Sequence, residues 1–580
     1  MLIKQNKLPV VLPILTGVST RMQRIYAARG IEHAEQLDRQ LNALLPFDTM
    51  MNIEKASKRL AQALQLQQRI LIIGDFDADG ATSSALAVTA LRAMGAENVD
   101  FLVPNRFSFG YGLTPGIVDV AKSSKPQLIV TVDNGIASID GVLAANKSGI
   151  DVLITDHHLP GDFLPEACAI VNPNQAGDAF PSKCMAGVGV IFYVMLALRR
   201  HLIGSGWFDT LKIPPPNMAQ FLDLVALGTI ADVVPLDKNN RILVHQGLLR
   251  IRKGLARPGI AALLEIAGKS IPSIRASDFG FAIAPRLNAA GRLDDMSLGI
   301  DCLLCDDLAK ARSLAIKLDC LNVERRKIES TMSEQAIFAL NTLTHRLAQT
   351  GNKLPVALCL LDESWHQGVI GILAGRLKER YHRPVIAFAR VSTDELKGSA
   401  RSVPGLNIRD VLAVIDRDHP GLMIKFGGHA MAAGLSLRPQ SFDAFEQAFV
   451  LRVSALLDQE LCTGVLYSDG SIDPSDMGLP LALELQDAGP WGQQFPEPVF
   501  DDRFEVLDQR IVGKNHLKLT LALDKTYDTL DAIAFNVDLK NWPNHRVKFI
   551  RAAYKLDINQ YQGRTKLQLL MQSLEAEVEN

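Results

Sequence analysis

The feature that most constrains this chain is the stretch ILIIGDFDADG, residues 70–80. Its apolar beginning predicts a short buried strand. Asp75, Asp77 and Asp79 follow at alternate positions, before a helical run over about residues 81–94. Carboxylates this close together cannot all stay ionised unless a cation neutralises them. The pattern therefore favours a divalent metal site, and a solvated acidic turn is the alternative.

Two further strands of the same kind end in polar side chains. An apolar run that begins near residue 126 ends at Asp133, and one that begins near residue 148 ends at His157 and His158. Continuous apolar strands that alternate with helices predict a parallel sheet covered on both faces. Ligands of such sheets bind at the carboxyl ends of the strands. Three strands with acidic or imidazole ends on one edge favour the metal site over the acidic turn.

A fourth segment adds another carboxylate. Residues 219–236 read as a helix that is apolar all round, hence buried, and that runs into Asp232. We interpret Asp232 as a ligand. The carboxylates and His157 together exceed what one octahedral ion needs, so we expect two ions, Mg²⁺ or Mn²⁺, bridged by one carboxylate. Such a pair suits in-line displacement at phosphorus. If the strand continues through the two histidines, we expect His158 to point away from His157. It would then donate a hydrogen bond to the phosphoryl oxygen or protonate the leaving group.

The remainder of the chain divides into segments that differ in composition and in the period of their apolar residues. We expect a helical extension over residues 1–50, an α/β domain over 51–300, a connector helix over 301–350, a second, smaller α/β domain over 351–459, and an OB-like β-barrel over 460–580. The connector has a plain core helix as its alternative.

Within the expected barrel, residues 546–566 carry six basic residues and one acid, Asp557, with Phe549, Tyr554 and Tyr561 interleaved. This composition fits a groove for single-stranded nucleic acid. A solvated barrel face with core aromatics fits it equally well.

Composition limits the setting. The net charge of −2 does not indicate a polyanionic partner, so any nucleic-acid surface must be local. We find neither an apolar run long enough for a membrane span nor a signal peptide, and seven scattered cysteines fit a reducing cytoplasm.

Four arginines lie in small-residue loops, where phosphate capture and structural salt bridges are the alternatives: Arg106, Arg286, Arg292 and Arg401.

At this point the motifs match a family. GDFDADG, VDNG, TDHH and TIADVVPL, in this order, resemble the DHH phosphoesterase superfamily. RLNAAGR, SARS, GGHAMAAG and the later GPWGQQFPEPVF resemble its RecJ branch, the single-strand-specific 5′→3′ exonucleases. The resemblance covers roughly residues 50–580. It implies the two α/β lobes and the OB module.

The resemblance also implies roles for individual residues. It makes Asp133 the bridging ligand and places His158 against the scissile phosphate. Related phosphatases carry a histidine ligand where this chain has Ile73, and we assign Asp75 to the metals as well. The implied metal ligands are thus Asp75, Asp77, Asp79, Asp133, His157 and Asp232. A pocket for the terminal 5′ phosphate would be lined by Arg106, Arg286, Ser399 and Arg401, with His429 reaching the substrate from the second lobe.

The resulting prediction is a cytoplasmic exonuclease that removes 5′-mononucleotides from single-stranded DNA with two divalent cations. The cleft between the lobes of the family would admit one strand and exclude a duplex. The family role implies recombination and mismatch repair, together with a single-strand-binding protein and a helicase. The alternatives are a phosphodiesterase for short oligonucleotides or cyclic dinucleotides, and a non-catalytic single-strand-binding protein.

Overall fold

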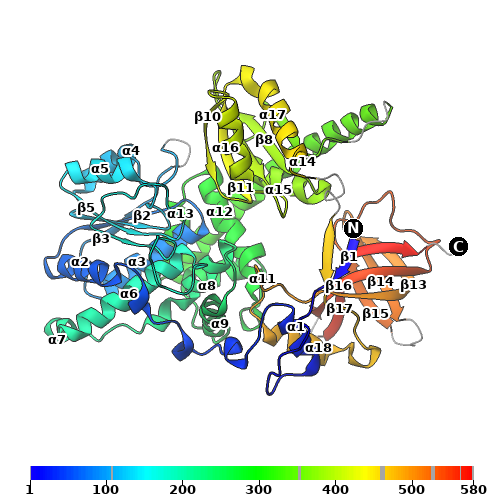
Figure 1. The fold of residues 1–580 in the computed structure, drawn as a ribbon. Coiled ribbons are helices and arrows are strands. Elements are labelled where there is room, and N and C mark those ends of the chain that lie inside the picture. Colours follow the sequence, from blue (N-terminus) through cyan, green and yellow to red (C-terminus); the bar gives the residue numbers. More distant parts are fainter. Residues whose placement is uncertain are drawn as a thin grey trace. The chain divides into compact units, whose positions relative to one another are not determined.

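The computed structural model describes residues 2–105, 109–349, 354–457, 464–523, 529–561 and 564–577. The chain forms two compact bodies (Figure 1). Residues 320–466, with the start of the chain, form the smaller body. Residues 3–319 and 467–580 form the larger one.

The larger body contains a parallel five-stranded sheet of order β3-β2-β4-β5-β6. Its strands are short and mostly buried, as continuous Ile, Leu and Val runs predict. They are β2 (Ile70–Gly74), β3 (Val99–Leu102), β4 (Leu128–Val132), β5 (Asp151–Thr155) and β6 (Ala169–Val171). The strand order reverses at β2, whose two neighbours are β3 and β4. A reversal of this kind leaves a crevice at the carboxyl ends of the adjacent strands β2 and β4. The predicted parallel sheet is confirmed.

Helices cover both faces of this sheet (Figure 1). One face packs on α4 (Pro115–Ala121) and α5 (Ile139–Lys147) through Ile117, Val118 and Val142. On the other side lie α2 (Ile53–Gln65), α3 (Ala78–Ala93), α6 (Gly187–Gly204) and α8 (Leu222–Ala231). Helix α6 is long and apolar enough to cross a membrane, with a mean hydropathy of 1.4. Because 67% of it is buried and it packs on α2, α3 and α8, the core accounts for its apolar character.

More helices complete this part of the larger body. They are α7 (Trp207–Leu211), α9 (Lys238–Arg252), α10 (Pro258–Ile266), α11 (Ala276–Asp278), the π-helical turn η7 (Phe279–Ile283), α12 (Ala284–Leu293) and α13 (Ser297–Leu304). The long helix α14 (Leu308–Gln349) follows, and the boundary between the bodies falls inside it, after residue 319. The predicted connector helix is therefore present.

The first fifty residues differ from the prediction. Only α1 (Thr20–Ala27) is an α-helix, and short 3₁₀ turns follow at Ala34–Leu37, Leu41–Ala43 and Phe47–Thr49. Tertiary hydrogen bonds replace helical ones, because the carbonyl of Gln36 accepts from Arg241 and that of Arg39 accepts from Gln246. The expectation of a largely helical extension was wrong for this reason.

Residues 19–40, which we call the N-terminal strap, bind the segment that precedes the barrel. Arg29 forms two hydrogen bonds of 2.9 and 3.0 Å with Asp469, and both side chains are almost fully buried. The hydroxyl of Tyr26 donates to the carbonyl of Ala488, and its ring stacks on Trp491. The strap therefore fixes a distant part of the chain.

The C-terminal module is a closed barrel of order β13-β14-β15-β17-β16, which confirms the predicted OB-like module. Its strands are β13 (Phe500–Val512), β14 (His516–Leu523), β15 (Thr529–Ala534), β16 (Phe549–Tyr561) and β17 (Arg564–Glu577). Helix α18 (Leu479–Ala488) precedes it, and β12 (Val465–Ser468) pairs with β1 (Leu2–Gln5).

The smaller body is the second α/β unit, with a mixed sheet of order β10-β11-β9-β8-β7. Only β7 and β8 are parallel. Its strands are β7 (Leu358–Asp362), β8 (Val385–Arg390), β9 (Leu396–Arg401), β10 (Met423–Gly428) and β11 (Ala432–Leu437). The helices are α15 (Ile370–Tyr381), α16 (Ile408–Asp418) and α17 (Phe442–Ser454).

Candidate metal centre

The acidic residues that follow β2 lie at one side of the sheet crevice. Asp77 caps helix α3, because its Oδ1 accepts hydrogen bonds from the amides of Asp79 and Gly80 at 2.9 and 3.0 Å. The helix therefore begins at Ala78 rather than at residue 81, and Asp79 lies in its first turn instead of in a loop. Asp75 accepts from the amide of Phe76 at 2.7 Å. These local hydrogen bonds orient Asp75 and Asp77, whereas both oxygens of Asp79 accept from the amides of Gly187 and Val188 at the start of α6, at 2.6 and 3.0 Å.

Asp133 follows β4 and lies at the other side of the crevice. It adopts a left-handed backbone conformation with φ of +62°, which is rare for a residue with a side chain and is often found at functional sites. Gly187 makes room for it, because a β-carbon at Gly187 would lie only 2.6 Å from the β-carbon of Asp133. The first residue of α6 must therefore be small for Asp133 to occupy this place.

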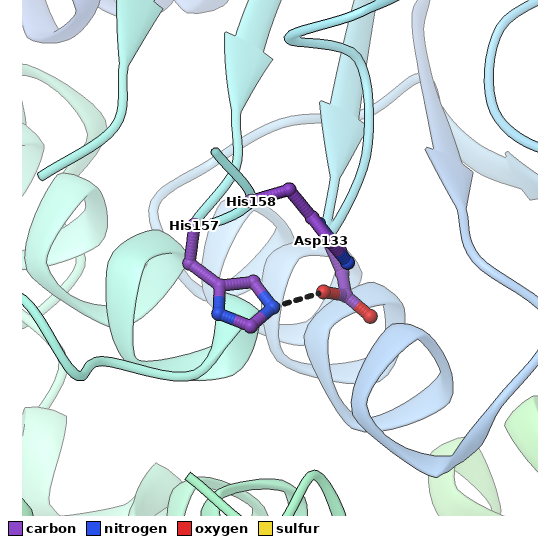
Figure 2. A group of neighbouring side chains, drawn as sticks. All are labelled: Asp133, His157 and His158. Atoms are coloured by element: carbon purple, nitrogen blue, oxygen red, sulfur yellow. Dashed lines mark ion pairs between the residues drawn. The ribbon is translucent and has the colours of Figure 1, made fainter. Parts of the chain in front are cut away.

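His157 and Asp232 meet Asp133 at the same point. The Nε2 atom of His157 lies 3.1 Å from Oδ1 of Asp133 (Figure 2). The same nitrogen lies 3.5 Å from Oδ2 of Asp232. These three atoms are buried, and none forms a hydrogen bond of acceptable geometry with the residues that the structure describes. Buried polar atoms without partners are costly, so a further ligand is expected between them.

All six predicted metal ligands come together. Their ligand atoms form two sets, Asp75–Asp77–Asp133 and Asp79–His157–Asp232, and the atoms within each set lie within 4.8 Å of one another. Asp133 also belongs to a third set, with His157 and His158. Because Asp133 joins the Asp75 side to the His157 side, it has the position required of a bridging carboxylate. The oxygen-rich donors suit Mg²⁺ or Mn²⁺.

The electrostatics of the site agree with a missing positive charge. Burial, followed by the charges of Asp79 and Asp77, raises the pKa of Asp133 well above its usual value. Burial and neighbouring carboxylates likewise raise the pKa of Asp79 to about 7 and that of Asp232 to about 8. Burial and His158 lower the pKa of His157. Without a metal, the site therefore disfavours negative charge on Asp79, Asp133 and Asp232 and favours a neutral imidazole at His157, which is the form that binds metals.

Asp156, the residue before the two histidines in TDHH, received no role in the sequence interpretation. Its Oδ1 accepts from the amides of His157 and His158 and lies 2.7 Å from Nδ1 of His158. Burial acts in the opposite direction, but this hydrogen bond and the charge of Asp156 raise the pKa of His158 to about 9. Asp156 thus holds a protonated imidazole beside the metal ligands. Its place in the TDHH motif was the available signal.

The predicted direction of His158 was wrong. Strand β5 ends at Thr155, so the alternation of a strand does not extend to the two histidines. Their ring centroids lie 4.5 Å apart, and both rings stay on the crevice side. The hydroxyl of Tyr111 lies 3.2 Å from Nε2 of His158 and donates to the carbonyl of Asp133 at 3.3 Å, which adds a further contact to this group.

The RLNAAGR motif supports the metal loop from helix α12. Oδ1 of Asn288 accepts from the amide of Ala78 at 2.7 Å. A β-carbon at Gly291 would collide with the carbonyl oxygen of Phe76. Arg286 of the same helix donates to the carbonyl of Ala282 and forms an ion pair of 2.9 Å with Asp319, and its Nε is buried without a described partner. Arg106, predicted for the same phosphate pocket, lies outside the described residues.

The other predicted phosphate ligands lie in the smaller body. Ser399 and Arg401 are on β9, where Nη1 of Arg401 lies 3.1 Å from the hydroxyl of Ser399. Arg401 has no acidic partner within 4 Å among the described residues, and burial lowers its pKa. His429 lies in the turn between β10 and β11, close in register to Ala432, which pairs with Arg401. Ser399, Arg401 and His429 therefore share one end of this sheet.

The basic stretch of the barrel is divided in its roles. Tyr554 is a core residue, because its ring packs on Phe504 and its hydroxyl donates to Asp502 at 2.6 Å. Arg551 and Lys555 form ion pairs with acids, of 2.9 and 3.0 Å. Arg546, Lys548, Arg564 and Lys566 have no ion-pair partner among the described residues, and the side chain of Tyr561 lies outside them. Of the six basic side chains on which the groove interpretation rests, four therefore have no ion-pair partner among the described residues.

Comparison with protein families gives three matches along the chain. Residues 69–229 match the DHH family, N-terminal domain. Residues 352–455 match the DHHA1 domain, and residues 468–573 match the RecJ OB domain. The three matches follow the order of the parallel sheet, the second sheet and the barrel.

Individual relatives match over the whole length. The single-stranded-DNA-specific exonucleases RecJ of Salmonella typhimurium and Escherichia coli are each 53% identical to this chain, over 98% of it and over 97% and 96% of their own lengths. Among solved structures, Thermus thermophilus RecJ in complex with Mn²⁺ matches with a TM-score of 0.78 and 29% identity. That match covers 97% of this chain and 76% of the other.

Proposed function

The chain belongs to the family of single-stranded-DNA-specific exonucleases RecJ, and we propose that it removes 5′-mononucleotides from single-stranded DNA by hydrolysis at a two-metal centre. The observation that carries the proposal is the set of three buried, unpartnered atoms at the sheet crevice, Oδ1 of Asp133, Nε2 of His157 and Oδ2 of Asp232. A cation at this place would satisfy all three at once.

The metal ligands divide into two shells joined by one residue. We assign Asp75 and Asp77 to one ion, Asp79, His157 and Asp232 to the other, and Asp133 to both, since their ligand atoms form these sets. When bound, the ions supply an activated water and neutralise the phosphoryl oxygens. The neutral state of His157 leaves its lone pair available for this role.

His158 is the residue of the chain that acts on the substrate. Its imidazole is protonated at neutral pH, because Asp156 accepts a hydrogen bond from it. A protonated imidazole beside the metal ligands donates a hydrogen bond to the phosphoryl oxygen and can pass a proton to the leaving oxygen. Asp156 acts through His158 and is a positioning residue.

Arg401 and Ser399, which lie 3.1 Å apart on β9, are proposed to receive the terminal 5′ phosphate together with His429 at the same end of the sheet. A half-buried guanidinium without an acidic partner favours an anion as its ligand. This pocket would select strand ends over internal positions and would therefore set the 5′→3′ polarity.

The test of polarity uses single strands that carry a label at either end, incubated with Mg²⁺, with Mn²⁺ or with EDTA. We expect early release of the 5′ label as a mononucleotide in both metals, slow loss of the 3′ label, and no release in EDTA. Early release of the 3′ label, or hydrolysis that persists in EDTA, would contradict the proposal.

The phosphate pocket has its own test. Arg401→Ala should slow the degradation of strands with a 5′ phosphate more than that of strands with a 5′ hydroxyl. Arg390→Ala is the matched control, because Arg390 lies on the neighbouring strand β8 and already pairs with Glu363 on the surface. An equal loss on both substrates for Arg401→Ala would remove this residue from the pocket.

The cellular setting follows from the family role. We place the protein in the cytoplasm, in DNA recombination and mismatch repair, beside a single-strand-binding protein and a helicase. Co-purification of the full chain with such proteins from cells, with and without nuclease treatment of the extract, tests this assignment. Loss of both partners after nuclease treatment would show that the proteins are held together by shared DNA and not by direct contact.

A further inference from the structure

A cavity of about 400 Å³ adjoins the end of helix α8. Ile230 and Val233, which flank the metal ligand Asp232 in the chain, both line it. Its other walls come from α9, from residues 275–281 and from residues 486–497, which precede the barrel. Pockets for single small ligands measure about 300–1,000 Å³, so this one has room for one ligand of nucleotide size.

The most unusual side chain of the cavity is Phe281. It is 87% exposed, and no ring contact joins it to another aromatic side chain in the described part of the chain. It lies on the π-helical turn η7, a conformation that is rare and frequent at functional sites. An exposed ring at the edge of a cavity is suited to stacking on a planar ligand.

The polar wall carries charges of both signs, because Asp487 and Glu497 line it beside the basic residues. Arg275 pairs with Asp557 at 2.7 Å, and Lys555 pairs with Glu497 at 3.0 Å. Arg252 donates only to the carbonyl of Ile274, and it has no acidic group within 4 Å among the residues described. Burial, with the nearby positive charges of Arg39 and Arg252, lowers the pKa of His245 to about 4. A guanidinium in this position suits a phosphate group.

Two further features connect the cavity with binding. Thr229 lines it, and its hydroxyl is buried without a hydrogen-bond partner in the described residues. Val233 has φ of +60°, which is strained for a β-branched residue, and its side chain is 62% exposed. Strain of this kind persists where the surroundings impose it, commonly at ligand sites.

From these observations we propose that the cavity binds one nucleotide unit, with its base against Phe281 and its phosphate toward Arg252. The proposal rests on the proposed function, because the unit would come from the single strand beyond the bond that is cut, or from the mononucleotide that is released. Both sources offer the same chemistry, a planar base with an attached phosphate.

The test compares Phe281→Ala with wild type in the full-length protein. Affinity for oligothymidylates of increasing length is measured by fluorescence anisotropy in EDTA, and affinity for thymidine 5′-monophosphate by calorimetry. Loss of one base–aromatic stack should weaken binding about five- to a hundredfold. Phe281→Tyr should bind like wild type. Phe163→Ala is the matched control, because Phe163 is 77% exposed and lies in the same body away from the cavity lining.

The outcomes separate the two sources. Weaker binding of the monophosphate by Phe281→Ala assigns the cavity to the released product, and weaker binding of strands alone assigns it to the strand. Equal affinity of Phe281→Ala and wild type for every strand and for the monophosphate would overturn the inference. Release of the 5′ label from a long single strand by the wild-type protein with Mn²⁺ is scored separately, since its failure would count against the proposed function and not against the cavity.

Discussion

The metal centre and the surface of the barrel are both rich in charged residues, but these residues differ in whether they have partners. At the centre, Asp133, His157 and Asp232 present buried atoms that have no hydrogen-bond partner in the described residues. On the barrel, Arg551 and Lys555 pair with Asp501 and Glu497 in contacts that solvent partly reaches. The count of charged residues in the two stretches of sequence does not reveal this difference.

The contrast teaches which charges point to function. A paired surface charge is near neutral in its effect on stability, with a median contribution of about 0–1 kcal/mol. A buried carboxylate without a counter-charge destabilises the metal-free fold and gains stability only when a ligand arrives. Whether a charged group has a partner therefore distinguishes the metal centre from the rest of the protein better than the number of charged residues does.

The largest effect is expected for Asp133→Asn, which removes the residue shared by both sets of ligands. Because metal catalysis supplies several kcal/mol, turnover should fall roughly a thousandfold. Calorimetric titration with Mn²⁺ should show reduced uptake. The unfolding midpoint of the metal-free protein should not fall, because burial and the neighbouring carboxylates, which raise the pKa of Asp133, already disfavour a charge at this position. Turnover near that of wild type would show that the buried carboxylate of Asp133 is not needed for the reaction.

A smaller loss is expected for Asp156→Asn, because Asp156 acts through its hydrogen bonds. Activity should fall about 10- to 100-fold, as is usual for residues that orient catalytic groups. The alkaline limb of the pH–rate profile should move to lower pH, since the charge that raises the pKa of His158 is removed. Asp151→Asn is the control, because Asp151 lies at the other end of β5 and pairs with Arg59 on the surface. An unchanged pH profile would argue against the positioning role.

The metal-free protein should lose stability as pH rises from about 4 to about 8. The raised pKa values of Asp79 and Asp232, about 7 and about 8, mean that the folded state binds more protons than the unfolded state in this range. The free energy of unfolding therefore falls with pH until both carboxyls are ionised. Thermal unfolding in EDTA should show this slope, and saturating Mn²⁺ should raise the midpoint most at the alkaline end. A flat profile in EDTA would refute the picture of uncompensated charge.

The smallest effect is expected on the barrel. Lys518 and Asp531 approach to 3.9 Å on neighbouring strands, and both are more than 30% exposed. Lys518→Ala should lower the free energy of unfolding by less than about 1 kcal/mol and leave turnover unchanged. Denaturant unfolding and the nuclease assay measure both quantities. A loss of activity as large as that of Asp156→Asn would show that paired surface charges also serve the reaction.

Local patterns predicted most of the sheet and its metal edge. Each strand is a short apolar run, and each ligand follows a strand or helix directly, so spacing alone placed Asp77, Asp133 and Asp232 at one edge. The failures arise where distant residues decide. The direction of His158 depends on Asp156 and on the end of β5. The role of Asn288 depends on a backbone amide 210 residues away.

The N-terminal strap has a consequence for synthesis of the chain on the ribosome. Arg29 and its partner Asp469 are separated by 440 residues. At typical elongation rates, the strap would wait roughly 20–90 seconds before the segment that it binds has been translated. During that interval, Tyr26 and Arg29 lack the surface that later buries them, so the first helix to leave the ribosome is among the last to be secured. The parallel sheet is therefore synthesised before Tyr26 and Arg29 can make these two contacts, whereas the strap contacts of Gln36 and Arg39 with Arg241 and Gln246 can form earlier.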